Sequence, residues 1–231
     1  GSDYFEVEPL NPMRRCTTLS VAAHTLYEKT NPYILPGPGG ILDLTHTKFH
    51  QETERVVKVT GSKFIPSENY TIKLEGVKRI GYRTISIAGT RDPVMIEKID
   101  EIIEGVKERV EDNFRNSGFK YYLDFKVYGK NGVMGALEPV KHTSSHELGI
   151  IIDAVADTQA IANTICSFTR STMLHYGYEG RISTAGNLAF PYSPSDFKIG
   201  EVFVFNIYHT IRVDDPCQLF PCETILIGGE K

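Results

Sequence analysis

The chain has 231 residues, of which 41% are hydrophobic and 23% are charged, and its net charge is -4. This length suits one large domain or two small ones, and a globule of this size should bury roughly 70% of its unfolded surface. The negative charge argues against binding to nucleic acid or to an anionic membrane, because both require a basic face. No apolar run approaches the roughly 20 residues that cross a bilayer. We therefore expect neither partner.

The first elements combine one helix with short strands. Thr17 or Thr18 can cap a helix that Asn31-Pro32 would end. Its apolar residues recur at the spacing of one helical face. They are Leu19, Ala22, Ala23 and Leu26. A rigid turn over residues 36–40 follows, and strands are predicted near residues 41–44, 55–60, 70–75 and 83–88.

The clearest helix begins after Asp92, which is a typical N-cap, and has Pro93 at its first position. Its apolar residues fall on one face. They are Met95, Ile99, Ile102, Ile103, Val106 and Val110. An alternating strand at 121–128 and an apolar strand at 148–156 follow, then a helix that Asp157 caps and Gly177 ends. Strands at 201–213 and 225–227 complete the chain.

From about residue 83 to residue 213 the order is strand, helix, strand, strand, helix, strand. This order is typical of the split βαβ arrangement of a ferredoxin-like sandwich. We therefore predict an α+β fold, with both helices on one face of a mostly antiparallel sheet. We expect one domain over residues 1–231, in which residues 81–215 form the ferredoxin-like core. Residues 1–80 would extend the sheet with additional strands and one helix.

This topology predicts a site at one edge of the sheet. The first two strands would be parallel, so the segments that follow them, 89–92 and 129–135, would lie at the same edge. The third strand starts at that edge and brings His142, His146 and Glu147, and the second helix returns there with Asn187. Convergence of glycine-rich and polar loops is typical of a ligand pocket.

The segment from Tyr128 to Gly135 has a glycine at every third position. Its amides could close around an anion, with charge from Lys130, although the spacing matches neither GxGxxG nor GxxxxGK[ST] and a tight irregular turn is the alternative. Arg91 could clamp a carboxylate or phosphate, or form an ion pair with a neighbouring acid. The predicted ligand-binding residues are Arg91, Gly129, Lys130, Asn131, Gly132 and Gly135.

The two histidines suit proton transfer better than metal binding. His142 and His146 have helical spacing, but Thr143-Ser144-Ser145 does not resemble a helix and HExxH is absent. We therefore predict no metal site. Either imidazole could act as a general base, and surface loop histidines are the alternative. Asn187 or Asn131 would polarise a carbonyl. The predicted catalytic residues are His142, His146 and Asn187.

The cysteines and the start of the chain bear on its setting. Cys16, Cys166, Cys217 and Cys222 include no CxxC pair. Reduced thiols in a cytoplasmic protein are the favoured interpretation, and a disulfide between Cys217 and Cys222 is the alternative. Cys166 should lie in the core. The chain begins Gly1-Ser2 without an initiator Met, so we expect it to be the C-terminal part of a longer protein.

Several stretches together resemble one known family. They are 20–28 (SVAAHTLYE), 36–40 (PGPGG), 81–84 (GYRT), 91–93 (RDP), 128–139 (YGKNGVMGALEP) and 184–187 (TAGN). They make the chain similar to the C-terminal portion of the acyclic terpene utilisation (AtuA-like) family. The resemblance implies that a larger α/β part precedes this portion. It also implies a role in the use of terpenols for growth, alongside enzymes that act on CoA thioesters. It implies no agreed catalytic residues.

Two functions follow as expectations. The first is binding of an acyl-CoA or other anionic metabolite in acyclic terpene or branched-acid catabolism, with coenzyme A as part of the substrate. The second is a non-catalytic structural, oligomerisation or ligand-sensing domain that supports the N-terminal α/β domain. In that case the aromatic strand over residues 202–208 would suit an interface in a homo-oligomer. The sequence does not decide whether the chain is an enzyme.

Overall fold

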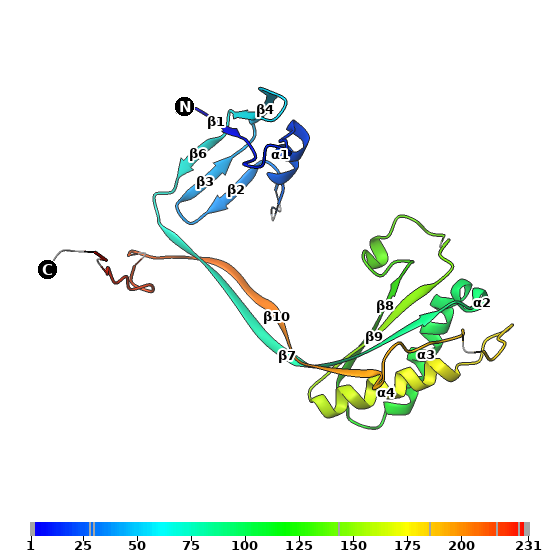
Figure 1. Cartoon of the computed structure of the whole chain (residues 1–231). Coiled ribbons are helices and arrows are strands. Elements are labelled where there is room, and N and C mark those ends of the chain that lie inside the picture. The colour runs from blue at the N-terminus through cyan, green and yellow to red at the C-terminus, as the bar shows by residue number, and fades with distance from the viewer. Residues whose placement is uncertain are drawn as a thin grey trace. The chain divides into compact units, whose positions relative to one another are not determined.

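A computed structural model describes residues 3–27, 29, 31–142, 144–184, 186–215, 217–225 and 227–228. Its internal contacts divide the chain into two compact units. Unit 1 comprises residues 1–76 and 206–231, and unit 2 comprises residues 77–205. Two long strands, β7 and β10, contribute residues to both units (Figure 1).

Unit 2 is built on a four-stranded sheet in the order β10-β7-β9-β8. Strand β9 is antiparallel to both β7 and β8, so those two strands run parallel on either side of it. Helices α3 and α4 contact each other, and α4 also contacts β8 and β9 (Figure 1). The elements are β7 (Thr71–Thr90), α2 (Pro93–Glu97), α3 (Ile99–Phe114), β8 (Tyr121–Tyr128), the 3₁₀ helix η1 (Gly135–Leu137), β9 (Leu148–Ala156), α4 (Gln159–His175) and β10 (Asp196–Arg212). This confirms the α+β class.

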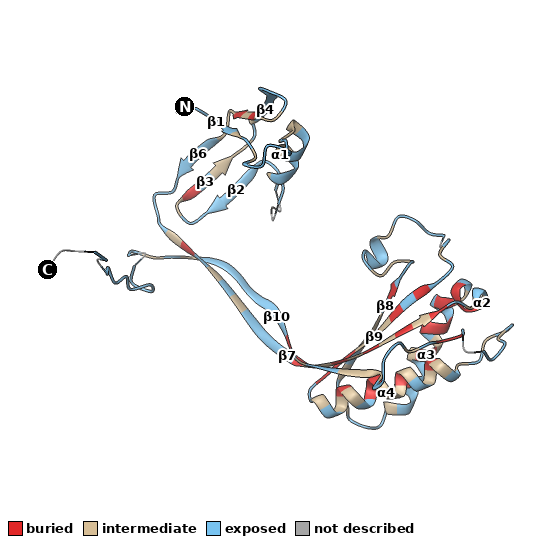
Figure 2. Cartoon of the chain, viewed as in Figure 1, coloured by how far each residue is buried: buried red, intermediate tan, exposed pale blue. Residues whose placement is uncertain are grey.

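The core of unit 2 lies between the helices and the sheet (Figure 2). The predicted apolar face of the helical segment after Asp92, which comprises α2 and α3, is buried throughout. It comprises Met95, Ile99, Ile102, Ile103, Val106 and Val110. Alternate residues of β9 face this layer and are fully buried, namely Leu148, Ile150, Ile152 and Ala154. In α4, Cys166 lies in the core as predicted.

Several predicted boundaries differ from the structure. The helix expected after Asp92 is two helices, α2 and α3, which meet at Lys98. Thr158 rather than Asp157 caps α4, because the Thr158 hydroxyl accepts a hydrogen bond from the Ile161 amide. Helix α4 ends at His175, before Gly177. These shifts leave the order of the elements unchanged.

The strands predicted at 70–75 and 83–88 are one strand of 20 residues, β7. Gly76 and Gly81 lie between the two predicted segments, inside β7. A Cβ atom at Gly81 would lie 2.5 Å from the Ala156 carbonyl oxygen, and one at Gly76 would lie 3.0 Å from Ile207. These glycines therefore let β9 and β10 approach β7 closely, and they lie in the interior of β7 and not at its end.

Unit 1 contains two antiparallel three-stranded sheets, β1-β5-β4 and β2-β3-β6. The sequence had suggested that residues 1–80 extend the four-stranded sheet. Residues 1–66 instead form separate sheets, and of the N-terminal strands only β7 joins the four-stranded sheet. Two of the pairings, β2 with β3 and β4 with β5, join strands that follow each other along the chain, whereas β1 pairs with the distant β5. The elements are β1 (Tyr4–Val7), α1 (Thr18–His24), β2 (Ile34–Gly37), β3 (Gly40–Asp43), β4 (Lys48–Gln51), β5 (Val57–Thr60) and β6 (Lys63–Pro66).

Helix α1 begins as predicted but ends early. Thr17 and Ser20 form a capping box at its start, and it ends at His24 rather than near residue 31. No residue of α1 is buried, and Leu19 is 78% exposed. The predicted turn at 36–40 is the tip of a hairpin in which Gly37 pairs with Gly40.

The remaining predictions concern the cysteines, the C-terminal segment and membrane helices. All four cysteines are free. Ile225 is in no strand, and Leu226, part of the strand predicted at 225–227, lies outside the described residues. Among the residues that the structure describes, no helix is long and apolar enough to cross a membrane.

Candidate functional site

The loops of unit 2 meet at one edge of the four-stranded sheet. Thr90, at the end of β7, pairs with Leu148, and Tyr128, at the end of β8, pairs with Gly149. The segment before β9 therefore lies beside the segments that follow β7 and β8. The loop after α4 also returns here, since the Arg91 amide donates to the Gly186 carbonyl at 3.1 Å. The topology thus brings together the four segments that the sequence singled out.

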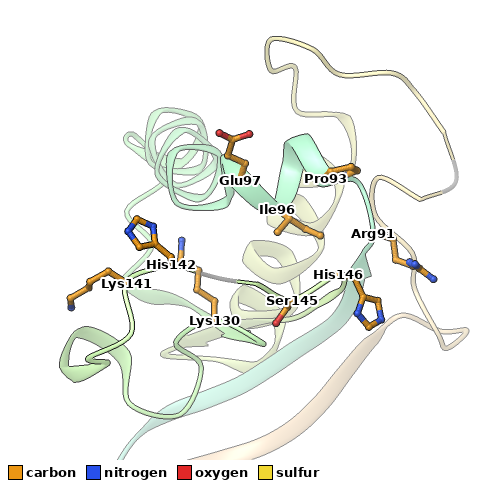
Figure 3. Close-up of a pocket in the computed structure, with 9 residues that line it drawn as sticks. All are labelled: Arg91, Pro93, Ile96, Glu97, Lys130, Lys141, His142, Ser145 and His146. Carbon is orange, nitrogen blue, oxygen red and sulfur yellow. The ribbon is translucent and has the colours of Figure 1, made fainter.

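A pocket of about 530 Å³ opens at this edge (Figure 3). Its nine lining residues come from two stretches, α2 with the residue just after β7, and the loop between β8 and β9. They are Arg91, Pro93, Ile96, Glu97, Lys130, Lys141, His142, Ser145 and His146. Three are cationic and one is acidic, and the volume lies within the usual range for small-molecule sites.

The glycine-rich loop does not form the predicted cradle of amides. The amides of Lys130, Asn131 and Gly132 all donate to the Val127 carbonyl, at 3.3, 3.1 and 2.8 Å. The Gly135 amide donates to the Asn131 carbonyl at 2.7 Å. These four donors are therefore used within the loop. The structure agrees with the alternative prediction, a tight irregular turn.

Close packing explains the glycine at position 132, and backbone conformation explains the one at position 129. A Cβ atom at Gly132 would lie 2.9 Å from the backbone of both Val127 and Tyr128, so a larger residue would push the turn off its strand. Gly129 has a φ of 91°, in the left-handed region that favours glycine. Gly129 also accepts a hydrogen bond from the Ser145 hydroxyl at 2.7 Å, which ties the turn to the segment before β9.

Lys130 lines the pocket, but its charge is compensated. The Lys130 Nζ lies 2.5 Å from the Asp100 carboxylate in α3, and the lysine side chain is only 17% exposed. Asn131 makes no side-chain hydrogen bond with any described residue. Within this structure Lys130 joins the loop to α3, so an anion that binds Lys130 would share it with Asp100.

Arg91 and Lys141 are the pocket's cations without an acidic partner. The exposed Arg91 guanidinium forms no ion pair with the residues that the structure describes, so the alternative of a neighbouring acid is not seen. Lys141 donates from Nζ to the Glu138 carbonyl at 2.7 Å and keeps two further N–H groups. Sequence reasoning missed Lys141, although it directly precedes His142.

The two predicted histidines both line the pocket and both are exposed. Figure 3 shows them at opposite ends, with His146 on the side of Arg91 and His142 on the side of Lys141. They are not brought together, and Thr143 between them lies outside the described residues. Among the described residues, no group of three or more His, Cys, Asp or Glu side chains could hold a metal ion.

Asn187 belongs to a separate polar network outside this pocket. Its Nδ2 donates to the Asp92 carboxylate and to the Tyr178 hydroxyl, the latter at 3.0 Å, and its Oδ1 accepts from the Thr184 amide at 2.7 Å. Asn187 is 4% exposed. Because its amide group is fully used, it is not free to polarise a carbonyl, and the structure corrects that prediction. Asn187 instead joins the loop after α4 to the start of α2.

Asp92 is the centre of this network. Its carboxylate caps α2 by accepting from the amides of Val94 and Met95, at 2.9 and 3.4 Å, and it also accepts from the Tyr178 hydroxyl at 2.6 Å. Burial alone would raise the pKa of Asp92, but these hydrogen bonds outweigh it and lower the pKa below its ordinary value. Burial, and then the bond to Asp92, raise the pKa of Tyr178 to about 12. The network therefore fixes the backbone beside Arg91, the residue before Asp92, at the pocket edge.

The fold and site define a class of protein: an α+β protein with a partly cationic pocket at one edge of its main sheet. A family model described as acyclic terpene utilisation family protein AtuA matches residues 11–192, which is most of the chain. The chain therefore belongs to this family, as the sequence resemblance had indicated. No curated protein and no solved structure matches it.

Proposed function

We propose that this protein binds an anionic metabolite in the pocket of unit 2, and that an acyl-CoA of acyclic terpene or branched-acid catabolism is the first candidate. The observation that carries the proposal is Arg91, an exposed guanidinium that lines the pocket without an ion-pair partner among the described residues. Arginine recognises carboxylate and phosphate groups through two parallel hydrogen bonds. Membership of the AtuA family supports the metabolic setting.

The energetics favour Arg91 as the principal anchor. The charge of Lys130 is already compensated by Asp100, so its net attraction for an anion is weaker than that of an unpaired cation. Arg91 loses only water. The backbone on which Arg91 stands is held by the hydrogen bond from its amide to Gly186 and by the cap at Asp92. Because this backbone is already fixed, binding at Arg91 does not have to order it.

The histidines are the proton-transfer candidates if the site is catalytic. His142 and His146 line the same pocket and are open to solvent. A histidine can accept or donate a proton near neutral pH, which suits reactions beside the carbonyl of a thioester. In this proposal, His146 serves a group near Arg91, and His142 serves a group near Lys141 (Figure 3).

A thermal-shift titration with coenzyme A and several branched acyl-CoA thioesters tests the binding. A ligand at about a hundred times its dissociation constant should stabilise the protein by roughly 2.7 kcal/mol. Arg91→Ala should remove most of that shift. Arg15→Ala is the matched control, because Arg15 is an exposed arginine of unit 1 whose side chain bonds to none of the residues that the structure describes. It should leave the shift unchanged.

The titration has a clear adverse outcome. If acyl-CoA stabilises the wild type and Arg91→Ala equally, the ligand does not use this pocket. If neither coenzyme A nor any acyl thioester stabilises the wild type, acyl-CoA is not the ligand of this chain. Inorganic phosphate and short carboxylates, titrated in the same way, then test the wider proposal of an anion site.

A second candidate function, an oligomerisation domain, is favoured by strand β10. This strand lies at the end of the four-stranded sheet, where it has one unpaired edge. It carries several exposed large hydrophobic side chains, with Phe205 72% exposed. They are Phe203, Val204, Phe205, Ile207 and Tyr208. Exposed apolar edge strands are typical sites of strand pairing between chains.

Light scattering over a range of protein concentrations tests this candidate. A stable dimer in the wild type, converted to monomer by Phe205→Glu, would support an interface on β10. Lys198→Glu, at an exposed polar position near the start of the same strand, is the control and should leave the mass unchanged. A wild type that stays monomeric at all concentrations would contradict the oligomerisation role.

A further inference from the structure

The two unneutralised cations of the pocket lie at opposite ends. Figure 3 shows Arg91 with His146 at one end and Lys141 with His142 at the other. Lys130 lies beside His142 in this view, and its charge is compensated by Asp100 at 2.5 Å. The positive charge that a ligand meets is therefore divided into two separate regions.

Between these regions the lining combines two apolar residues with Lys130 and Ser145, whose polar atoms are already bonded, and with Glu97. Ile96 of α2 is 8% exposed and forms part of the lining together with Pro93. Ser145 also lies in the middle of the pocket, but its hydroxyl donates to the Gly129 carbonyl at 2.7 Å. A ligand segment that crosses the pocket would thus contact Pro93 and Ile96, with Glu97 as the charged side chain that has no ion-pair partner among the described residues. Hydrocarbon suits this stretch better than a polar chain.

Glu97 adds a second constraint. It is the acidic residue of the lining and comes from α2, on the same helix as Ile96. A carboxylate repels a ligand that carries negative charge along its whole length. It tolerates a ligand whose charges are kept at the ends, where Arg91 and Lys141 attract them. The charge pattern of the lining therefore matches a ligand with charged ends and a neutral middle.

We propose that the ligand of this pocket carries two anionic groups, carboxylate or phosphate, joined by a hydrocarbon segment. Arg91 binds one group and Lys141 binds the other, while the segment lies along Pro93 and Ile96. This inference rests on the proposed anion-binding function and makes it more specific. Arg91 suits a planar carboxylate through two hydrogen bonds, and Lys141 supplies a point charge that accepts either group.

Isothermal titration with two matched series of carboxylates tests the inference. The first series is the dicarboxylates succinate, adipate and suberate. The second is the monocarboxylates of the same chain lengths, butyrate, hexanoate and octanoate. We expect one dicarboxylate to bind roughly tenfold or more tightly than its monocarboxylate, because a second charge-assisted contact forms only at the matching length. Inorganic phosphate measures the affinity of a single anionic group.

Two variants assign the ends of the ligand. Arg91→Ala and Lys141→Ala should each lower the affinity for the preferred dicarboxylate to about the affinity for the monocarboxylate of the same length. Lys120→Ala, at an exposed lysine just before β8, is the control for lost surface charge and should preserve the preference. A parallel measurement of the His142 and His146 imidazole signals by NMR should show that the preferred dicarboxylate perturbs both.

The outcomes separate this inference from the function on which it rests. Equal affinity for the two series, with binding still lost in Arg91→Ala, would overturn the two-anion ligand and keep a single anion site. Absence of binding by every carboxylate and by phosphate would overturn both. A dicarboxylate preference that survives Lys141→Ala would also overturn the assignment, because the second group would then bind elsewhere.

Discussion

The two units of this chain differ in how much of their hydrophobic surface is buried. The main core cluster consists entirely of residues of unit 2 and lies between the helices and the sheet. Among the described residues of unit 1, the buried hydrophobic side chains are Val57, Val59 and Ile72. Unit 1 has short strands and one exposed helix, whereas unit 2 has long strands covered by helices. The loops that line the candidate pocket therefore start from the better-packed unit, and a rigid framework positions functional groups more precisely.

The strongest test of this comparison removes the same atoms from each unit. Ile152→Ala, at a fully buried position of β9, should lower the free energy of unfolding by about 2–5 kcal/mol because it leaves a cavity. Ile65→Ala, in β6 of unit 1, is the matched control. Ile65 is 50% exposed, so its replacement should cost much less. Urea unfolding followed by circular dichroism measures both, and equal losses would contradict the contrast.

The polar network around Asp92 should give the next largest effect. Asp92→Ala removes the cap of α2 and leaves Tyr178 and Asn187 without their shared acceptor. We expect a loss of about 1–3 kcal/mol in unit 2. Asp214→Ala is the control, at an exposed aspartate of unit 1 that has no side-chain bond to a described residue. A loss for Asp92→Ala no larger than that of the control would show that the network does not support the pocket edge.

Helix caps provide a smaller, matched contrast. Thr158 caps α4, which packs on the sheet, and Thr17 caps α1, which buries no residue. Thr158→Ala should cost about 1 kcal/mol in the unfolding of unit 2. Thr17→Ala should change only amide exchange near α1, because that helix adds nothing to the core. Hydrogen exchange of each variant distinguishes these results, and slowed or unchanged exchange at α4 in Thr158→Ala would refute the first.

The last contrast depends on pH. The pKa of Tyr178 is raised from 10.0 to about 12, so the folded state favours the protonated phenol. This contribution to stability is fully present below about pH 10 and is lost as the pH rises toward 12. Tyr178→Phe should therefore flatten the alkaline loss of stability of unit 2. Urea midpoints from pH 8 upward measure it, and an unchanged alkaline slope in the variant would exclude Tyr178 as its cause.

The pKa of Asp92 acts in the opposite direction. It is lowered below its ordinary value of 3.8, so its stabilising contribution is present above that pH and is lost as the pH falls further. Asp92→Asn should therefore weaken the acid dependence of unit 2. The same urea experiment, extended to low pH, measures this change.

Local patterns in the sequence determined much of unit 2. The apolar face of α3, the alternation in β8 and the continuous apolar run of β9 are visible in short windows, and burial follows them closely. The order of these elements also predicted which loops share one edge of the sheet. Five of the predicted site residues, Arg91, Lys130, His142, His146 and the neighbouring Gly129, do lie at that edge. Their proposed functions remain predictions.

Only the tertiary structure decided how the polar groups are used. The sequence could not show that the loop amides turn back to Val127, or that Lys130 meets Asp100 in another helix. It could not show that the Asn187 amide donates to Asp92, or that residues 1–66 form separate sheets. Periodicity reports which face of an element is apolar, because that depends on neighbours along the chain. Hydrogen-bond and strand partners depend on residues far apart in sequence, so they are settled only when the chain has folded.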